Sequence, residues 1–152
     1  MTEKTHSSAE PVGHEAIEGT LNVPMVEIDL EEEIGQLQKE DAWLHGIGRS
    51  SKTLVKHNDL RIVLISMKAN TQMHEHKATA RISIQTLTGH VQLRVVGRTV
   101  DLPAGHLISL DQCLPHDVEA LKDSSLLLTL SWPPASVIGE CKPHESEQQS
   151  HS

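Results

Sequence analysis

The stretch Met73-His74-Glu75-His76, followed further along the chain by Leu114-Pro115-His116, decides which fold this sequence indicates. Successive side chains of a strand point to opposite faces, so His74 and His76 would share one face. The run from His116 to Ala120 alternates in the same way. This places His116 on the face of Val118 and leaves Asp117 and Glu119 on the other face. The pattern predicts three imidazoles on the inner side of a β-structure, although two histidines at this spacing also occur on polar strand edges.

Three imidazoles on one face point to metal chemistry. Imidazole is the commonest protein ligand for metal ions near neutral pH. His74, His76 and His116 are therefore candidate ligands of one divalent transition metal. Imidazoles alone do not select among Fe, Mn, Zn and Ni, so the identity of the metal stays open. A short motif of this kind also occurs by chance, and it needs support from the rest of the chain.

Composition narrows the class of partner. The chain has 152 residues, enough for a single domain with tails, and a formal net charge of −8 without a basic cluster, which argues against nucleic acid. It contains no Phe or Tyr and only two Trp, so a pocket would be walled by aliphatic side chains, Met and His. No stretch approaches the roughly 20 apolar residues that span a bilayer, and no apolar signal-peptide core is recognisable. We expect a cytoplasmic protein without a membrane partner.

Composition also divides the chain into segments. Polar ends flank a middle rich in short apolar runs. The expected segments are a disordered arm at 1–20, an N-terminal extension at 21–50, a barrel at 51–134 and a polar C-terminal tail at 135–152.

One helix is expected in the extension, over about residues 30–39. Asp29 is placed as its N-cap, with Glu32 as the capping-box partner three residues later. Leu30, Ile34 and Leu37 follow at helical spacing and form one apolar face. The acids of the first turn are accounted for by the helix dipole.

From Lys52 onward, short apolar segments alternate with turns. Eight or nine strands at this spacing indicate a β-sandwich or β-barrel. The expected strands cover Thr53–Lys56, Leu60–Met67, the His74 segment, Ile82–Leu87, Val91–Val95, Thr99–Leu102, Leu107–Leu110, the His116 segment and Ser125–Trp132.

The region from about Lys52 to Trp132 resembles the conserved barrel of the cupin family. The first motif of that family is matched by His74-Glu-His76 and Gly89. The second is matched by Gly97, Pro103-Ala-Gly105 and His116. The resemblance implies an all-β jelly-roll barrel, here with a short N-terminal helix and polar tails, that holds a metal or a ligand inside.

The sequence departs from the cupin pattern at the site. The acid of the first motif falls on Arg81 or Ile82, so three histidines remain of a four-ligand set. Gln85 is a candidate for the fourth, oxygen ligand, although it alternates with residues that look like core. Arg81 is a candidate for binding a carboxylate or phosphate bidentately. Its alternative is a solvent-facing position at the start of a strand.

Other histidines and the two cysteines receive simpler interpretations. His90 and His106 follow turn glycines and are expected outside the barrel. Cys113 and Cys141 offer one possible disulfide and no Cys-x-x-Cys motif, and we interpret them as reduced thiols, with Cys113 buried and inert.

Three functions remain open at this point. The first is a cupin that binds a divalent metal, a small anionic molecule, or both, inside the barrel; if it is an enzyme, it would be metal-dependent, of dioxygenase or isomerase type. The second is a non-catalytic module that binds or senses a small molecule. The third is a structural dimer with a degenerate metal site. A homodimer is expected in each case, because exposed strand edges need cover.

Overall fold

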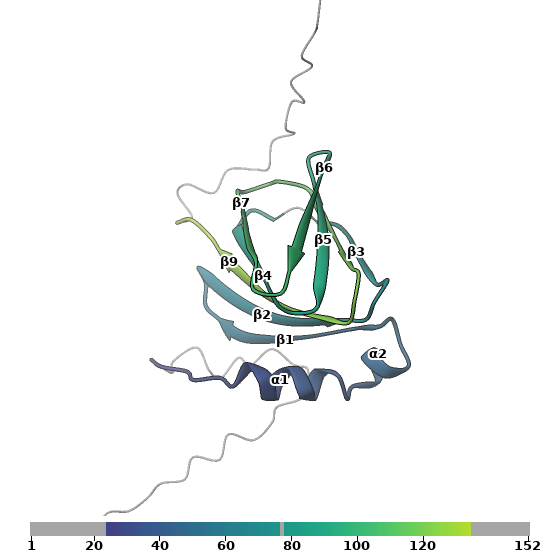
Figure 1. Ribbon diagram of the computed structural model, residues 1–152. Helices are drawn as coiled ribbons and strands as arrows, with labels where there is room; N and C mark the ends of the chain where they lie inside the picture. The colour runs from purple at the N-terminus through teal and green to yellow at the C-terminus, as the bar shows by residue number, and fades with distance from the viewer. Residues whose placement is uncertain (1–23, 77, 135–152) are drawn as a thin grey trace, which may run out of the picture.

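The computed structural model describes residues 24–76 and 78–134, which form two helices followed by nine strands (Figure 1). The arm at 1–20 and the tail at 135–152 lie outside the described residues. The elements are α1 (Leu30–Leu37), α2 (Asp41–Leu44), β1 (Arg49–Lys56), β2 (Leu60–Met67), β3 (Gln72–His76), β4 (Arg81–Thr88), β5 (His90–Val95), β6 (Arg98–Pro103), β7 (Leu107–Leu110), β8 (His116–Ala120) and β9 (Ser124–Ser131).

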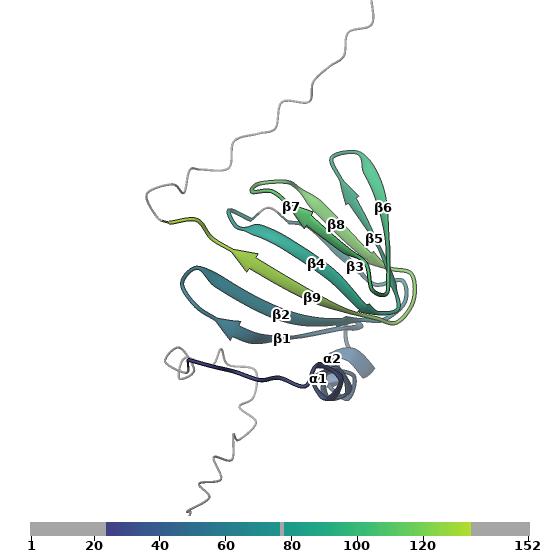
Figure 2. The same ribbon diagram turned by 60° about the vertical axis from the view of Figure 1, so that its left-hand side comes forward.

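The strands form two antiparallel sheets that face each other. The larger sheet has the order β1-β2-β9-β4-β7, and the smaller has the order β3-β8-β5-β6. The sheets approach each other at one end and diverge toward the end that carries the β1–β2 hairpin (Figure 2). The all-β class expected from the sequence is confirmed, because every expected strand coincides with an observed one to within a few residues.

The core lies between the two sheets. Ile82 and Ile84 of β4 are buried while their neighbours are more exposed, and Val118 and Ala120 of β8 show the same alternation. This period of two is what a strand with one inward face requires. The buried cluster consists of Ile65, Met67, Ile82, Ile84, Val91, Leu93, Leu102, Leu110, Val118, Ala120 and Leu126.

The N-terminal helices lie outside the barrel, beside β1 and β2 (Figure 1). Helix α1 begins after Asp29, whose Oδ1 accepts a hydrogen bond from the Glu32 amide at 3.1 Å. The carboxylate of Glu33 accepts from Lys52 Nζ on β1 at 2.7 Å. The observed helix, Leu30–Leu37, is shorter than the expected one over about 30–39. One of its first-turn acids, Glu33, also binds the sheet, in addition to its favourable interaction with the helix dipole.

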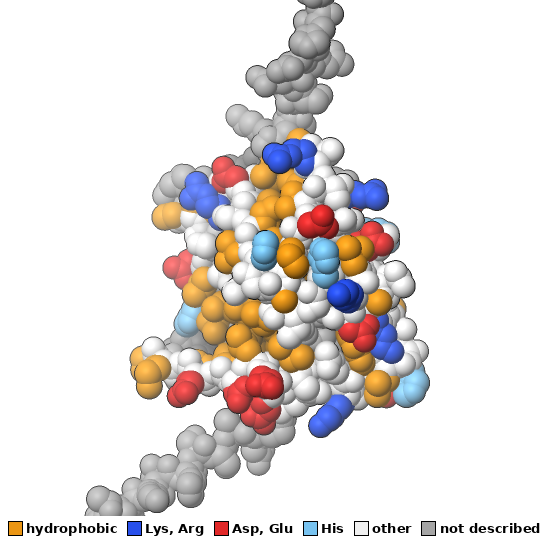
Figure 3. Space-filling model, in the orientation of Figure 1, with side chains coloured by type: hydrophobic (Ala, Val, Ile, Leu, Met, Phe, Trp, Pro, Cys, Tyr) orange, Lys and Arg blue, Asp and Glu red, His pale blue; other side chains and the backbone are white. Residues whose placement is uncertain are grey.

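The described surface is mixed. Apolar side chains gather over β1 and β2 on the face shown in Figure 3, among scattered charged groups. Among the described residues, no helix is long and apolar enough to cross a membrane.

Candidate functional site

A cavity of about 320 Å³ lies between the two sheets. Both sheets contribute to its walls, and among the described lining residues His116 alone has a polar side chain. Ligand pockets are typically of about 300 Å³ or more, with mostly apolar walls and a few polar groups. The lining residues are Ile65, Met73, Ala78, Ile82, Ile84, His116, Val118, Leu126, Leu128 and Leu130.

The cavity has a deep end and a mouth. Along β9, Leu126 is buried, whereas Leu128 and Leu130 are only partly buried. Leu130 pairs with Ile82 at the start of β4, so the more exposed end of the cavity lies where β9 ends and β4 begins. This is the end at which the sheets diverge (Figure 2).

His116 lies at the mouth, on the wall opposite β9. The segment that leads into β8 is held to the segment before β4, because the Cys113 amide donates to the Ala78 carbonyl at 2.9 Å. The His116 side chain is 6% exposed. Its Nδ1 donates to the Leu114 carbonyl at 3.0 Å. Since a carbonyl can only accept, Nδ1 carries a proton, and the lone pair of the neutral ring is on Nε2.

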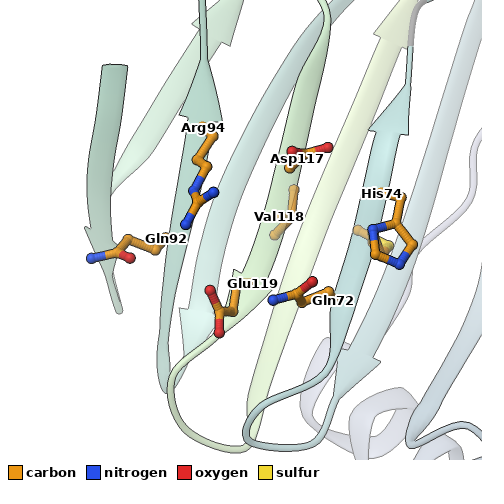
Figure 4. Close-up of a pocket in the computed structure, with 8 residues that line it drawn as sticks. Gln72, His74, Gln92, Arg94, Asp117, Val118 and Glu119 are labelled. Atoms are coloured by element: carbon orange, nitrogen blue, oxygen red, sulfur yellow. The ribbon is translucent and has the colours of Figure 1, made fainter. Parts of the chain in front are cut away.

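His74 lies on the other face of the same sheet. Its exposed side chain lines a shallow outer depression of about 40 Å³, together with polar side chains of β5 and β8 (Figure 4). The structure therefore does not bring His74 together with His116, in contrast to the expectation from alternation. The other polar lining residues of this depression are Gln72, Gln92, Arg94, Asp117 and Glu119.

A register shift in β3 explains the difference. His76 is opposite His116 in the β3–β8 pairing, but the residue opposite Val118 is Met73. Three residues of β3 thus advance against two of β8, as in a β-bulge. Regular pairing from His76 would have placed His74 opposite Val118, facing the cavity. The bulge gives that inward position to Met73.

The three-histidine metal site stays a prediction. Among the side chains that the structure describes, which do not include those of Glu75 and His76, no group of three His, Cys, Asp or Glu is placed to hold a metal ion. The described part of the site offers His116 on the inside and, by backbone register, the position of His76 directly across from it.

Gln85 and Arg81 both face away from the cavity. Gln85 pairs with Leu107 and Leu127, and it alternates with the inward-facing Ile84. Arg81 has a side chain that is 70% exposed, and its Nε lies 3.1 Å from Asp111 Oδ1. The solvent-facing alternative for Arg81 is the one the structure adopts.

His90 and His106 lie outside the cavity, as expected. His106 is exposed, and His90 Nε2 lies 3.3 Å from Asp101 Oδ1 on the outer face of β5 and β6. Hydrogen bonds from Gln92 and then from His90 lower the pKa of Asp101 below its usual value. Both groups stabilise the charged carboxylate. Because these hydrogen bonds are exposed, we assign the network to the surface of the sheet and not to the cavity.

Cys113 corrects one expectation. It is half-buried and disulfide-bonded, so its interpretation as a reduced thiol was wrong. The other cysteine, Cys141, lies outside the described residues. The sequence offered one possible disulfide but could not establish it, because disulfide formation depends on the distance between Cα atoms and on the direction of the side chains.

Comparison with solved structures identifies the fold. A cupin 2 conserved barrel domain protein from Leptotrichia buccalis superposes with a TM-score of 0.53 and 26% identity, over 55% of this chain and 40% of that one. This chain is a cupin barrel. A conserved protein of unknown function from Streptococcus pyogenes, SPY1581, matches with a TM-score of 0.59 and 24% identity, over 72% of this chain and 90% of that one.

A third match, of lower sequence identity, concerns an enzyme. A salicylate 1,2-dioxygenase variant from Pseudoaminobacter salicylatoxidans, solved with gentisate, matches with a TM-score of 0.62 and 14% identity, over 68% of this chain and 32% of that one. Identity this low supports the shared fold alone. No protein-family model and no curated protein matches the sequence of this cupin.

Sequence reasoning missed two residues at the mouth of the cupin cavity, Arg61 and Trp132. Arg61 pairs with the cavity-lining Leu130 across β2 and β9, and its guanidinium carbon lies 5.3 Å from the centre of the Trp132 ring. A signal was present, because Arg61 shares its strand parity with Val63 and Ile65 in an otherwise apolar strand.

Proposed function

We propose that this cupin binds a small, largely apolar molecule inside its barrel. The supporting observation is the cavity of about 320 Å³, walled by aliphatic side chains around His116. Each methylene group that leaves water for such a site contributes roughly 0.8 kcal/mol. His116 gives the wall a polar group that would orient the ligand. A single imidazole among the described lining residues, which are otherwise apolar, supports a binding or sensing role more directly than a reaction.

The test uses a neutral probe and cavity reporters. Addition of 1-hexanol to protein with ¹³C-labelled isoleucine methyl groups should shift the signals of Ile65, Ile82 and Ile84, which line the cavity. The signal of Ile47, which is exposed, should stay in place. Saturable shifts at the lining residues would support binding inside the barrel; shifts confined to Ile47, or none at all, would refute it.

A matched pair of variants confirms the location. Leu128→Trp adds volume at a lining position and should abolish the shifts caused by 1-hexanol. Leu121→Phe enlarges a side chain that is partly exposed outside the cavity, and it should leave binding unchanged. Equal binding by both variants would place the probe elsewhere.

A metal-dependent function is the second candidate. Its support is the register that sets His76 directly opposite His116. If a divalent ion is held there, His116→Ala and His76→Ala should each remove most of the bound metal. His74→Ala should retain it, because His74 lies on the outer face.

Metal content is measured by mass spectrometry after incubation with Zn, Ni or Mn at neutral pH. Wild-type protein that takes up none of the three ions would eliminate this candidate. Equal loss of metal in all three histidine variants would instead support the original three-histidine site.

A further inference from the structure

Arg61 occupies an unusual position for a charged side chain. It lies next to Leu130 in the β2–β9 register, and Leu130 in turn pairs with Ile82. Residues directly opposite each other in antiparallel strands share a face. The guanidinium of Arg61 therefore extends the inward-facing row of the larger sheet and stands at the mouth of the cavity.

The guanidinium of Arg61 contacts an aromatic ring, and its Nε lacks a hydrogen-bond acceptor among the described residues. The Trp132 ring lies 5.3 Å from its Cζ, a distance at which the aromatic face attracts the cation. The Trp132 amide donates to the Asp59 carbonyl at 2.9 Å, which holds the residue after β9 against the residue before β2. The Nε of Arg61 is buried, and no described residue supplies it with an acceptor. A buried donor without a partner is costly, so an arriving acceptor would be favoured there.

The charged side chains near Arg61 also favour the binding of an anionic acceptor. Lys56 pairs with Arg61 across the β1–β2 hairpin, so a second cation projects from this face at the mouth. Among the described side chains, no carboxylate forms an ion pair with Arg61 or Lys56, whereas Arg81 nearby is paired with Asp111. Arg61 and Lys56 thus place two cations on this face, in a chain whose formal net charge is −8, and the one nearby acid of the hairpin, Asp59, forms no ion pair with either among the described residues.

We infer that the ligand is a small monocarboxylate with an apolar body, whose carboxylate is bound by Arg61 while its body fills the cavity. This inference rests on the proposed function, since it requires the cavity to be the binding site. A guanidinium offers parallel donors to a carboxylate, and such charge-assisted pairs are stronger than neutral ones. The Trp132 ring lies within cation–π distance of the guanidinium and limits the positions that the Arg61 side chain can take.

The experiment compares hexanoate with 1-hexanol, which have the same number of carbon atoms and differ in charge. Both are titrated against the isoleucine methyl signals of the full chain, for wild type and for Arg61→Met. We expect Arg61→Met to weaken hexanoate about tenfold or more, because it removes the charge-assisted contact, and to leave 1-hexanol within about twofold. Arg61→Lys should recover part of the lost hexanoate affinity.

Two controls accompany this comparison. Arg94→Met removes the same charge from the outer face of the smaller sheet and should change neither affinity. In a Trp43→Phe background, Trp132 is the one remaining tryptophan, so hexanoate should alter its fluorescence and 1-hexanol should alter it less. Melting curves establish that each variant is folded before titration.

The outcomes separate the two claims. If 1-hexanol binds and Arg61→Met weakens both probes equally, or neither, the assignment of Arg61 fails while the proposed function stands. If neither probe moves the cavity signals of the wild type, the proposed function fails, and this inference fails with it. Selective loss of hexanoate supports both.

Discussion

At the scale of single residues, the turn between β5 and β6 contains a valine in a backbone conformation that valine rarely adopts. Val95 pairs with Arg98, so the β5–β6 hairpin closes over Val96 and Gly97 alone. Both turn residues have positive φ, 49° and 74°. Two-residue turns of this kind favour Asn-Gly, because a β-branched residue is strained in the left-handed region.

Val96→Asn should therefore stabilise the protein. The side chain of Val96 is 62% exposed, so little apolar burial is lost. Relief of the strained φ should raise stability by about 1 kcal/mol, seen as a rise of a few degrees in the melting temperature. Val26→Asn, a change at another exposed valine, is the control and should leave the melting temperature nearly constant. A lower melting temperature for Val96→Asn than for its control would contradict this account.

The candidate site was partly predictable at this scale. The alternation from His116 to Ala120 gave the inward position of His116 correctly, because β8 pairs regularly with β5. The position of His74 was not predictable, since a one-residue bulge changes the partners of every residue beyond it. Arg61 was missed because its significance depends on Leu130 of β9 and on Trp132 just after that strand, both far away in the sequence.

At the scale of elements, strands were easier to predict than helices. Short apolar runs between turn residues, some of them alternating, located the strands that the structure describes, but the four-residue α2 has too few residues to show a helical period. Helix α1 was recognisable from Asp29 and its apolar stripe. The stripe indicated that α1 packs on the domain, but it did not specify that α1 and α2 contact the outside of the larger sheet.

The attachment of α1 depends on Leu37, which is 1% exposed. Leu37→Ala should cost about 2 to 5 kcal/mol, the usual range for a fully buried leucine. Leu44→Ala, at a position that is 46% exposed, should cost much less. Chemical denaturation of both variants gives the free energies of unfolding. A loss for Leu37→Ala as small as that for Leu44→Ala would mean that α1 adds little to the stability of the barrel.

At the scale of the whole molecule, we propose a homodimer. The strands β1 and β7 end the larger sheet, and β3 and β6 end the smaller, so four edges need protection. Leu107 of the edge strand β7 is 58% exposed, which makes this edge the candidate contact. Symmetric pairing of identical chains is the commonest way to cover such a surface.

Light scattering at micromolar concentration should give twice the mass of one chain. Leu107→Lys should shift the protein toward the monomer, because it places a charge in the contact, whereas Val96→Lys on the exposed β5–β6 turn should not. A monomeric wild type would refute the dimer. A dimer unaffected by Leu107→Lys would place the contact on another edge.

The register shift in β3 also has an evolutionary meaning. Loss of the single codon for Met73 would remove the extra residue and restore even pairing between β3 and β8. His74 would then lie opposite Val118 and face the interior, beside the row that contains His116. A pocket walled mainly by aliphatic groups and one with a further histidine are thus separated by the deletion of one codon, with the barrel around them unchanged.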